Sequence, residues 1–298
     1  KIASEVIETG GNAIDAGVAA GLASNVIQSD MCNLGGVAPI ILKQANSNKV
    51  WSISGVGTWS SSVTINKYLT KHKSDIPIGA PSCVIPAAFD AWITALSRFG
   101  TKSFSEISQY AIYYAENGYP LDLRTATSFK LMGESFKSWE SSKKIYWPNG
   151  RPPKTGEILK QKDLANLLKL LKSSENGESR KVALENTRKA FYSGDIAKEI
   201  VKWVNKGGGW MTINDLRSFR NEVYLAPSYK YGGWDVYTGD IYCQGPVLLQ
   251  SLSILKGFNL KSLNHNSPEY IHLVTEAMKI AFSDREKFYG DNIDYKYR

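Results

Sequence analysis

The sequence predicts a mixed α/β fold in which helices outnumber strands and the strands fall into two clusters far apart along the chain. Two apolar runs, residues 37–42 and 50–53, flank a polar turn and form the first cluster. Residues 229–237 form the second, and segments with helical periodicity and capping residues occupy much of the rest. This order favours a layered α/β body over a doubly wound repeat of βαβ units.

The first two helices are predicted to meet at a tight corner. Gly10 and Gly11 end a helix over residues 1–9, and Asn12 can cap the next helix, with Asp15 near its positive end. That second helix runs from residue 13 to about residue 26 and consists mostly of Ala, Gly and Val. Its backbone can therefore approach a neighbour closely, as a helix that lies flat on a sheet must.

The first strand cluster has the pattern of a hairpin. Residues 45–48 supply the turn between the two apolar runs. The continuous run over residues 38–42 is typical of a strand covered on both faces, in a sheet sandwiched between layers. A surface ribbon is the alternative.

The remaining elements are predicted mostly from caps and breakers. A helix begins near residue 84 with Pro86 in its first turn and stops at Gly100, and Ser103 with Glu106 makes a capping box for another. Residues 140–155, rich in Lys, Pro and Gly, are predicted to form a loop. Further helices are expected over residues 159–171, 181–191, 196–205, 246–255 and 268–288 and after Thr212 with Asp215, and a strand pair is expected to bend at Gly232 and Gly233.

The composition is that of an ordinary globular protein. The 298 residues are 43% hydrophobic and 21% charged, which is enough chain for one large domain or two small ones. The formal charge is +8, but the 36 Lys and Arg are scattered among 28 Asp and Glu and form no long cationic block. We therefore expect no nucleic-acid partner.

Cysteine and histidine usage argues against a zinc site and a disulfide framework. Cys32, Cys83 and Cys243 form no CxxC pair, and the histidines do not lie at metal-ligand spacing with them. An odd number of thiols fits a reducing compartment, or one leftover thiol in an oxidising one. The compartment is therefore left open, with the cytoplasm slightly favoured over secretion.

The longest apolar stretch, residues 13–27, contains Asp15 and Asn25 and is too short to cross a bilayer, so no membrane span is expected. The chain has no initiator Met, and Lys1 begins directly in a helical pattern. We expect further residues, with any targeting signal, before Lys1.

Few residues have the setting of a nucleophile. No GxSxG pentapeptide occurs, and His265 and His272 are expected to be surface or helix-end residues. Cys243 stands between a strand and a helix, where the helix N-terminus would present backbone donors. Because no His or Lys is identifiable as its base, a packed structural thiol is favoured over a nucleophile. Residues 207–209, all glycine, lack the Lys-Ser/Thr of a phosphate loop and are expected to end a helix.

An ordered series of short motifs runs from Lys1 to about Asp294. Its members are Gly10-Gly11-Asn12-Ala13-Ile14-Asp15-Ala16, Asn33-Leu34-Gly35-Gly36, Gly79-Ala80-Pro81, Phe99-Gly100-Thr101, Ala115-Glu116-Asn117-Gly118-Tyr119, Phe191-Tyr192-Ser193-Gly194-Asp195-Ile196-Ala197, Gly208-Gly209 with residues 212–216, residues 229–237, residues 248–258, Glu276-Ala277, Asp284-Arg285 and Gly290-Asp291. In this order the series resembles the large subunit of the γ-glutamyltranspeptidase family of N-terminal-nucleophile hydrolases. The motif over residues 10–16 and the order together make the resemblance specific.

The resemblance implies a four-layer αββα sandwich, with residues 1–298 as a single domain that a second subunit completes. It implies a zymogen that cleaves itself, whose small subunit begins with a threonine downstream of Arg298. The hydroxyl of that threonine attacks an amide carbonyl with its own α-amine as base, and water or an amine resolves the acyl-enzyme. No catalytic residue is then expected in this chain, which supplies scaffold and one wall of the pocket.

The partners implied are the companion small subunit from the same precursor and a small-molecule amide substrate. A dimer of such heterodimers is a conceivable assembly. No cofactor is implied for a hydrolase or transferase of this kind.

The chain departs from the family at two places. Family members carry, after the second strand, an arginine that binds the α-carboxylate of a γ-glutamyl group, whereas this chain has Gly55, Val56 and Gly57, with Val56 at about the arginine's position. Cys243-Gln244-Gly245-Pro246 replaces a Pro/Ser/Gly-rich turn. We therefore take Gly55, Val56 and Gly57 as candidate substrate-binding residues, and we predict an amide substrate that is not a standard γ-glutamyl amide.

Two alternatives remain open. A true γ-glutamyltransferase or glutathione hydrolase would need a cation from elsewhere, and Arg124 is one conceivable donor. A scaffold that has lost catalysis and only binds a ligand is the other. A Thr, Ser or Cys after a processing junction downstream of Arg298 would favour an enzyme, and its absence would favour the scaffold.

Overall fold

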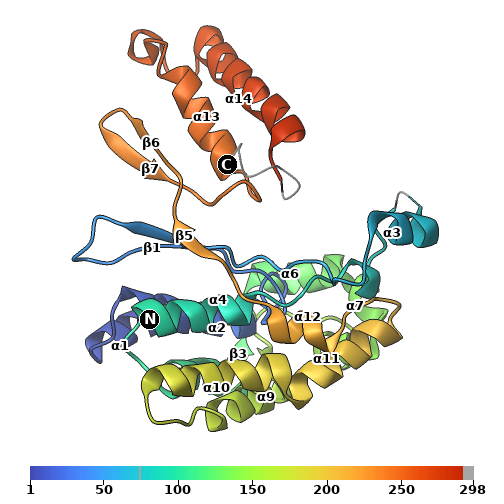
Figure 1. The fold of residues 1–298 in the computed structure, drawn as a ribbon. Helices are drawn as coiled ribbons and strands as arrows, with labels where there is room; N and C mark the ends of the chain where they lie inside the picture. The colour runs from blue at the N-terminus through green and yellow to red at the C-terminus, as the bar shows by residue number, and fades with distance from the viewer. Residues whose placement is uncertain (74, 291–298) are drawn as a thin grey trace. The chain divides into compact units, whose positions relative to one another are not determined.

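The computed structural model describes residues 1–73 and 75–290, so the last part of the motif series, residues 291–294, lies outside it. The chain divides into two compact units (Figure 1). Unit 1 contains Lys1–Ala38 and Gly55–Asn221, and unit 2 contains Pro39–Ser54 and the chain from Glu222 onward.

Unit 1 is mainly helical. Helix α2 packs against α1, α4 and α5; α9 packs against α5; and α10 packs against α4, α9, α11 and α12. The bounds are α1 (Ile2–Glu8), α2 (Ala13–Ile27), α3 (Ile65–His72), α4 (Ala88–Phe99), α5 (Phe104–Asn117), α6 (Leu123–Leu131), α7 (Gly133–Lys137), α8 (Glu140–Tyr146), α9 (Lys162–Ser173), α10 (Arg180–Ser193), α11 (Asp195–Lys206), α12 (Ile213–Ser218), the 3-10 turn Ala80–Ser82, and the antiparallel strands β3 (Tyr119–Pro120) and β4 (Ile158–Leu159).

The N-terminus of α2 is capped as predicted. Asn12 and Asp15 form a capping box, and the buried Asp15 also accepts hydrogen bonds from the backbone N–H groups of Thr101 and Lys102, at 2.8 and 3.0 Å. Burial raises the pKa of Asp15, but the hydrogen bonds from Lys102, Thr101 and Asn12 outweigh it and hold the pKa below its ordinary value. The capping box at the start of α2 therefore also fixes the turn at Thr101 and Lys102, which follows α4.

Unit 2 contains an antiparallel sheet with strand order β1-β2-β5, a separate hairpin of β6 and β7, and two helices that lie side by side (Figure 1). Both predicted strand pairs are confirmed, and Gly232 and Gly233 form the turn of the second pair with φ of +57° and +89°. The bounds are β1 (Ile40–Lys43), β2 (Val50–Ile53), β5 (Val223–Leu225), β6 (Ser228–Tyr231), β7 (Trp234–Tyr237), α13 (Gly245–Leu255), the 3-10 turn Leu260–Ser262 and α14 (Pro268–Phe288).

Several predicted boundaries were wrong. Residues 140–146 of the predicted loop form α8. Pro86 precedes α4, which begins at Ala88, and the carbonyl of Pro86 accepts a hydrogen bond from the Tyr192 hydroxyl at 2.7 Å. The helix predicted from residue 159 begins at Lys162, because Ile158–Leu159 pairs with β3 as a strand.

The prediction that the first strand is buried on both faces is also wrong within the described chain. Leu42 is buried, but Ile41 keeps 47% of its surface exposed. Neighbouring side chains of a strand point to opposite faces, so β1 is covered on the face of Leu42 and exposed on the face of Ile41. The exposure on that second face is confined to part of the sheet, because Ser52, which pairs with Ile41, is buried.

A buried ion pair holds α4, α10 and the end of unit 1 together. Arg188 on α10 donates to the carboxylate of Asp90 on α4 and to the carbonyl of Phe219. Asn221 donates to the same carboxylate through its backbone N–H at 2.8 Å and its side chain at 2.9 Å. Because Asp90 and Arg188 are almost fully buried, each depends on the other for its counter-charge.

Replacing Arg188 with methionine should therefore destabilise the fold strongly. We expect Arg188→Met in the full-length protein to lower the free energy of unfolding by about 3–5 kcal/mol, since Asp90 would remain buried without a cation. The matched control is Lys198→Met, which breaks an exposed pair with Asp195 and should change the free energy of unfolding little, because solvent screens that pair. Denaturant unfolding measures both, and equal effects of the two variants would contradict the prediction.

Candidate functional site

The three candidate residues after β2 occupy a tightly constrained loop. Gly55 is buried with φ of +59°, a conformation that favours glycine, and its carbonyl accepts a hydrogen bond from the Ala38 N–H at 2.8 Å. Gly57 lies so close to the backbone that an added Cβ would fall 1.8 Å from the Ile85 carbonyl oxygen. Val56 is thus held between two positions that require glycine, and its own side chain is partly exposed.

A carboxylate fixes the next part of the loop. Asp215, in the first turn of α12, accepts hydrogen bonds from the Ser60 hydroxyl at 2.7 Å, the Ser61 hydroxyl at 2.6 Å and the Ser61 N–H at 3.0 Å. It also completes the predicted capping box with Thr212. Burial raises the pKa of Asp215, but the hydrogen bonds from Ser61, Ser60 and Thr212 outweigh it, so the pKa lies well below its ordinary value.

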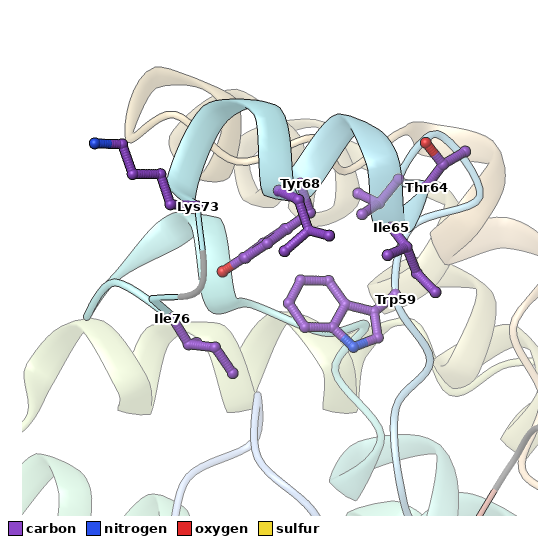
Figure 2. Close-up of a pocket in the computed structure, with 8 residues that line it drawn as sticks. Trp59, Thr64, Ile65, Tyr68, Lys73 and Ile76 are labelled. Atoms are coloured by element: carbon purple, nitrogen blue, oxygen red, sulfur yellow. The ribbon is translucent and has the colours of Figure 1, made fainter.

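Between these two anchored parts of unit 1 the loop carries Trp59, which lines a pocket beneath α3. The cavity has a volume of about 360 Å³ (Figure 2). Its lining is formed by Trp59, Val63, Thr64, Ile65, Tyr68, Leu69, Lys73 and Ile76. The pocket therefore begins only a few residues after Val56 and is mainly apolar.

The other candidate, Arg124, lies in the first turn of α6. Its guanidinium Nη1 is 3.4 Å from Oδ2 of Asp30, whose side chain has no exposed surface, while half of the Arg124 side chain is exposed. Asp30 is thus the ion-pair partner of Arg124 within the described residues. Arg124 lies on a helix, whereas Gly55, Val56 and Gly57 lie on a loop. The carboxylate of Asp30 already opposes the charge of Arg124.

Cys243 lies in unit 2 between β7 and α13, as predicted from its position between a strand and a helix. Its Sγ donates to the Asp240 carbonyl oxygen at 3.2 Å and accepts from the Gly245 N–H at 3.4 Å. These two contacts stabilise the turn into the helix, which fits a structural thiol. His265 contacts the ring of Tyr270.

Neither a metal site nor a membrane span is evident in the described part of the chain. Its His, Cys, Asp and Glu side chains form no group of three or more that could hold a metal ion. None of its helices is both long enough and apolar enough to cross a membrane.

The pocket helix α3 was missed in the sequence, although a signal for it exists. Ile65, Tyr68, Leu69 and His72 follow the spacing of one helix face, and Thr64 caps the helix by accepting from the Lys67 N–H. The link from Asp215 to Ser60 and Ser61 could not have been found this way, because it joins residues about 150 positions apart.

Comparison with known proteins identifies the fold. The chain matches a solved γ-glutamyltranspeptidase from Helicobacter pylori with a TM-score of 0.89 and 30% identity, over 97% of this chain and 81% of that one. The α/β class predicted from the sequence is confirmed by this match, and the fold is that of an N-terminal-nucleophile hydrolase.

Sequence comparison gives the same family. The family model for gamma-glutamyltranspeptidase matches residues 1–297. The glutathione hydrolase-like YwrD proenzyme of Bacillus subtilis (strain 168) is 31% identical over 97% of this chain and 53% of its own length, and the acylase ACY 1 proenzyme of Pseudomonas sp. (strain SE83) is 27% identical over 95% and 50%. The chain therefore belongs to the γ-glutamyltranspeptidase family, and it spans about half the length of these curated relatives.

The anchoring role of Asp215 gives a pH-dependent prediction. Asp215→Asn should lower the free energy of unfolding at pH 7 by about 1–3 kcal/mol, because the serine donors lose a charged acceptor. The folded pKa is below the ordinary value of 3.8, so the ionised carboxylate stabilises the fold fully above that pH. This stabilisation is lost as the pH falls through the folded pKa.

The stability gap between the wild-type protein and Asp215→Asn should therefore narrow as the pH falls below about 4. Denaturant unfolding at a series of pH values measures the gap. The control is Asp195→Asn, which alters an exposed carboxylate and should change little at any pH. A gap for Asp215→Asn that stays constant down to pH 2 would contradict the assignment.

Proposed function

We propose that this chain is the large-subunit part of an autoprocessed amidohydrolase or acyltransferase. The observation that carries the proposal is that this chain, which the family model matches over residues 1–297, covers only about half the length of relatives that are named as proenzymes. The remaining half would supply the companion small subunit, beginning with a nucleophilic threonine downstream of Arg298. Residues 1–298 would then act as one domain that the companion completes.

In this proposal the two parts divide the chemistry. The threonine hydroxyl attacks the amide carbonyl carbon, the α-amine of the same residue takes up the hydroxyl proton, and the amine of the substrate leaves with a proton. Water or a second amine then attacks the acyl-enzyme and releases the acyl group. This chain contributes no attacking group; Gly55, Val56 and Gly57 form one wall against the substrate.

We further propose that the substrate is not a standard γ-glutamyl amide. Leaving the α-carboxylate of such a substrate against Val56 would cost a few kcal/mol relative to a bidentate arginine. The acylase relative is consistent with a family in which acyl groups vary.

A true γ-glutamyltransferase that uses Arg124 is the less favoured alternative. Moving Arg124 onto a substrate would take the counter-charge away from Asp30, whose side chain is fully buried. The other alternative, a binding scaffold without catalysis, predicts a full-length protein that never cleaves itself. Intact mass and N-terminal sequencing of that protein distinguish an enzyme from a scaffold.

The companion subunit should be required for stable folding. Residues 1–298 produced alone are expected to be insoluble or molten, because the sheet β1-β2-β5 exposes Ile41 and Leu225, by 47% and 55%, and its outer edges pair with no further strand among the described residues. Coexpression with the downstream segment should restore a cooperative fold. Near-ultraviolet circular dichroism and dye binding test this, and a soluble, cooperatively folded monomer of the fragment would contradict it.

The substrate proposal is tested by comparing acyl groups on one leaving group. The processed enzyme should turn over γ-glutamyl-p-nitroanilide with a kcat/KM no more than about a hundredth of that of a true transpeptidase, equivalent to about 2.7 kcal/mol. Val56→Arg should raise this kcat/KM, whereas Val56→Met, of similar length but uncharged, should not. Efficient and selective use of the γ-glutamyl compound by the wild-type enzyme would refute the proposal.

A further inference from the structure

The pocket beneath α3 is built mainly of apolar surface. The rings of Trp59 and Tyr68 meet edge to face, with centroids 5.3 Å apart and planes at 80°. Ile65 and Ile76 lie on the lining with 71% and 70% of their surface exposed, and Trp59 with 43%. Lys73 contributes its alkyl stem, while its ammonium points away from the pocket (Figure 2).

The walls are held from outside the pocket. On α3, Lys71 donates to the Gly208 carbonyl oxygen at 3.0 Å and lies over the Trp210 ring, and Lys67 donates to the Ser62 carbonyl oxygen at 2.9 Å. The loop that carries Trp59 is fixed at the residues that follow it, because Ser60 and Ser61 donate hydrogen bonds to Asp215. Because both walls are anchored, the space between them is a preformed cavity rather than a chance gap between side chains.

This lining selects the chemistry of an occupant. A volume of about 360 Å³ lies within the usual range of small-ligand pockets, which are mostly apolar. A carboxylate placed between Trp59 and Tyr68 would lose its hydration, and because the ammonium of Lys73 is directed elsewhere it would meet only neutral donors such as the Tyr68 hydroxyl. A neutral aromatic or short aliphatic group would instead cover exposed tryptophan and isoleucine surface.

The pocket lies within reach of the candidate substrate wall. Trp59 follows Val56 by three residues, so an extended chain between them spans about 10 Å. A group attached to an amide carbonyl at the Gly55–Gly57 wall could cover such a distance with a short chain or one ring. We propose that this pocket binds the apolar end of the acyl group of the amide substrate; the inference rests on the proposed function.

The test uses the processed full-length protein and two p-nitroanilides that differ only in the acyl group, phenylacetyl and acetyl. The wild-type enzyme should favour the phenylacetyl compound in kcat/KM by at least about tenfold, and Trp59→Ala should reduce that ratio about tenfold or more. The matched control is Trp203→Ala, an equally drastic change at a 61% exposed tryptophan on α11, which should leave the ratio unchanged. Ile76→Ala gives a smaller second test of the same wall.

Binding of phenylacetamide, measured by calorimetry, separates this inference from the proposed function. If no amide is hydrolysed but phenylacetamide binds, and binding is lost in Trp59→Ala and kept in Trp203→Ala, the proposed function fails and the pocket stands as a binding site. If amides are hydrolysed with a ratio that Trp59→Ala does not change, or if phenylacetamide fails to bind, the pocket proposal is overturned. If Trp59→Ala folds but no longer cleaves itself or assembles with its companion, and Trp203→Ala does both, the pocket would be a binding site for the companion chain. That result would also overturn the proposal that the pocket binds the acyl group.

Discussion

The buried pair of Asp90 and Arg188 is the constraint on which the candidate site depends. It joins α4 to α10 and, through Asn221, to the end of unit 1. Asn221 also donates to the Ala87 carbonyl, so the residues just before α4 are held in place. A buried pair of this kind gains little net stability over an apolar core, but it tolerates very few alternative arrangements. Its main effect here is to define where α4 begins.

The start of α4 in turn shapes the loop that carries Val56. The carbonyl of Gly36 accepts from the N–H groups of both Ala87 and Ala88, and Ile85 donates to the Thr58 carbonyl at 2.9 Å while its own carbonyl leaves room only for glycine at position 57. The loop therefore cannot shift to bring in a longer cation-bearing residue at position 57 without moving α4. Under the proposed function, a substrate at this wall would meet a valine between two glycines, which would favour acyl groups without a nearby charge.

Much of the fold follows from local sequence signals, because caps and tight turns are determined by residues close together in the chain. Asn12 with Asp15, Ser103 with Glu106 and Thr212 with Asp215 all form the capping boxes that their spacing predicts. Helix α8 was missed because the lysines, prolines and glycines of residues 140–155 suggested a loop, whereas no element was predicted over residues 65–72, where α3 forms. The pairing of Arg124 with Asp30 and of Asp215 with Ser60 joins distant segments, and a single sequence carries no local sign of either contact.

The pocket is formed in part by an exposed helix, whereas the core is formed by helices with buried faces. This difference affects how substrate preference could change within the family. None of the residues of α3 is buried, and the helix is held by surface contacts of Lys67 and Lys71. Substitutions on its inner face would therefore alter the pocket at little cost to stability, whereas a change at Asp90 or Arg188 would strongly destabilise unit 1. The residue at position 56 and the apolar lining at α3 can therefore each change without a change in the core. Exchanging a charge for apolar surface at the wall requires no change in the scaffold, so one fold can retain its nucleophile chemistry while its acyl preference moves from charged to apolar groups.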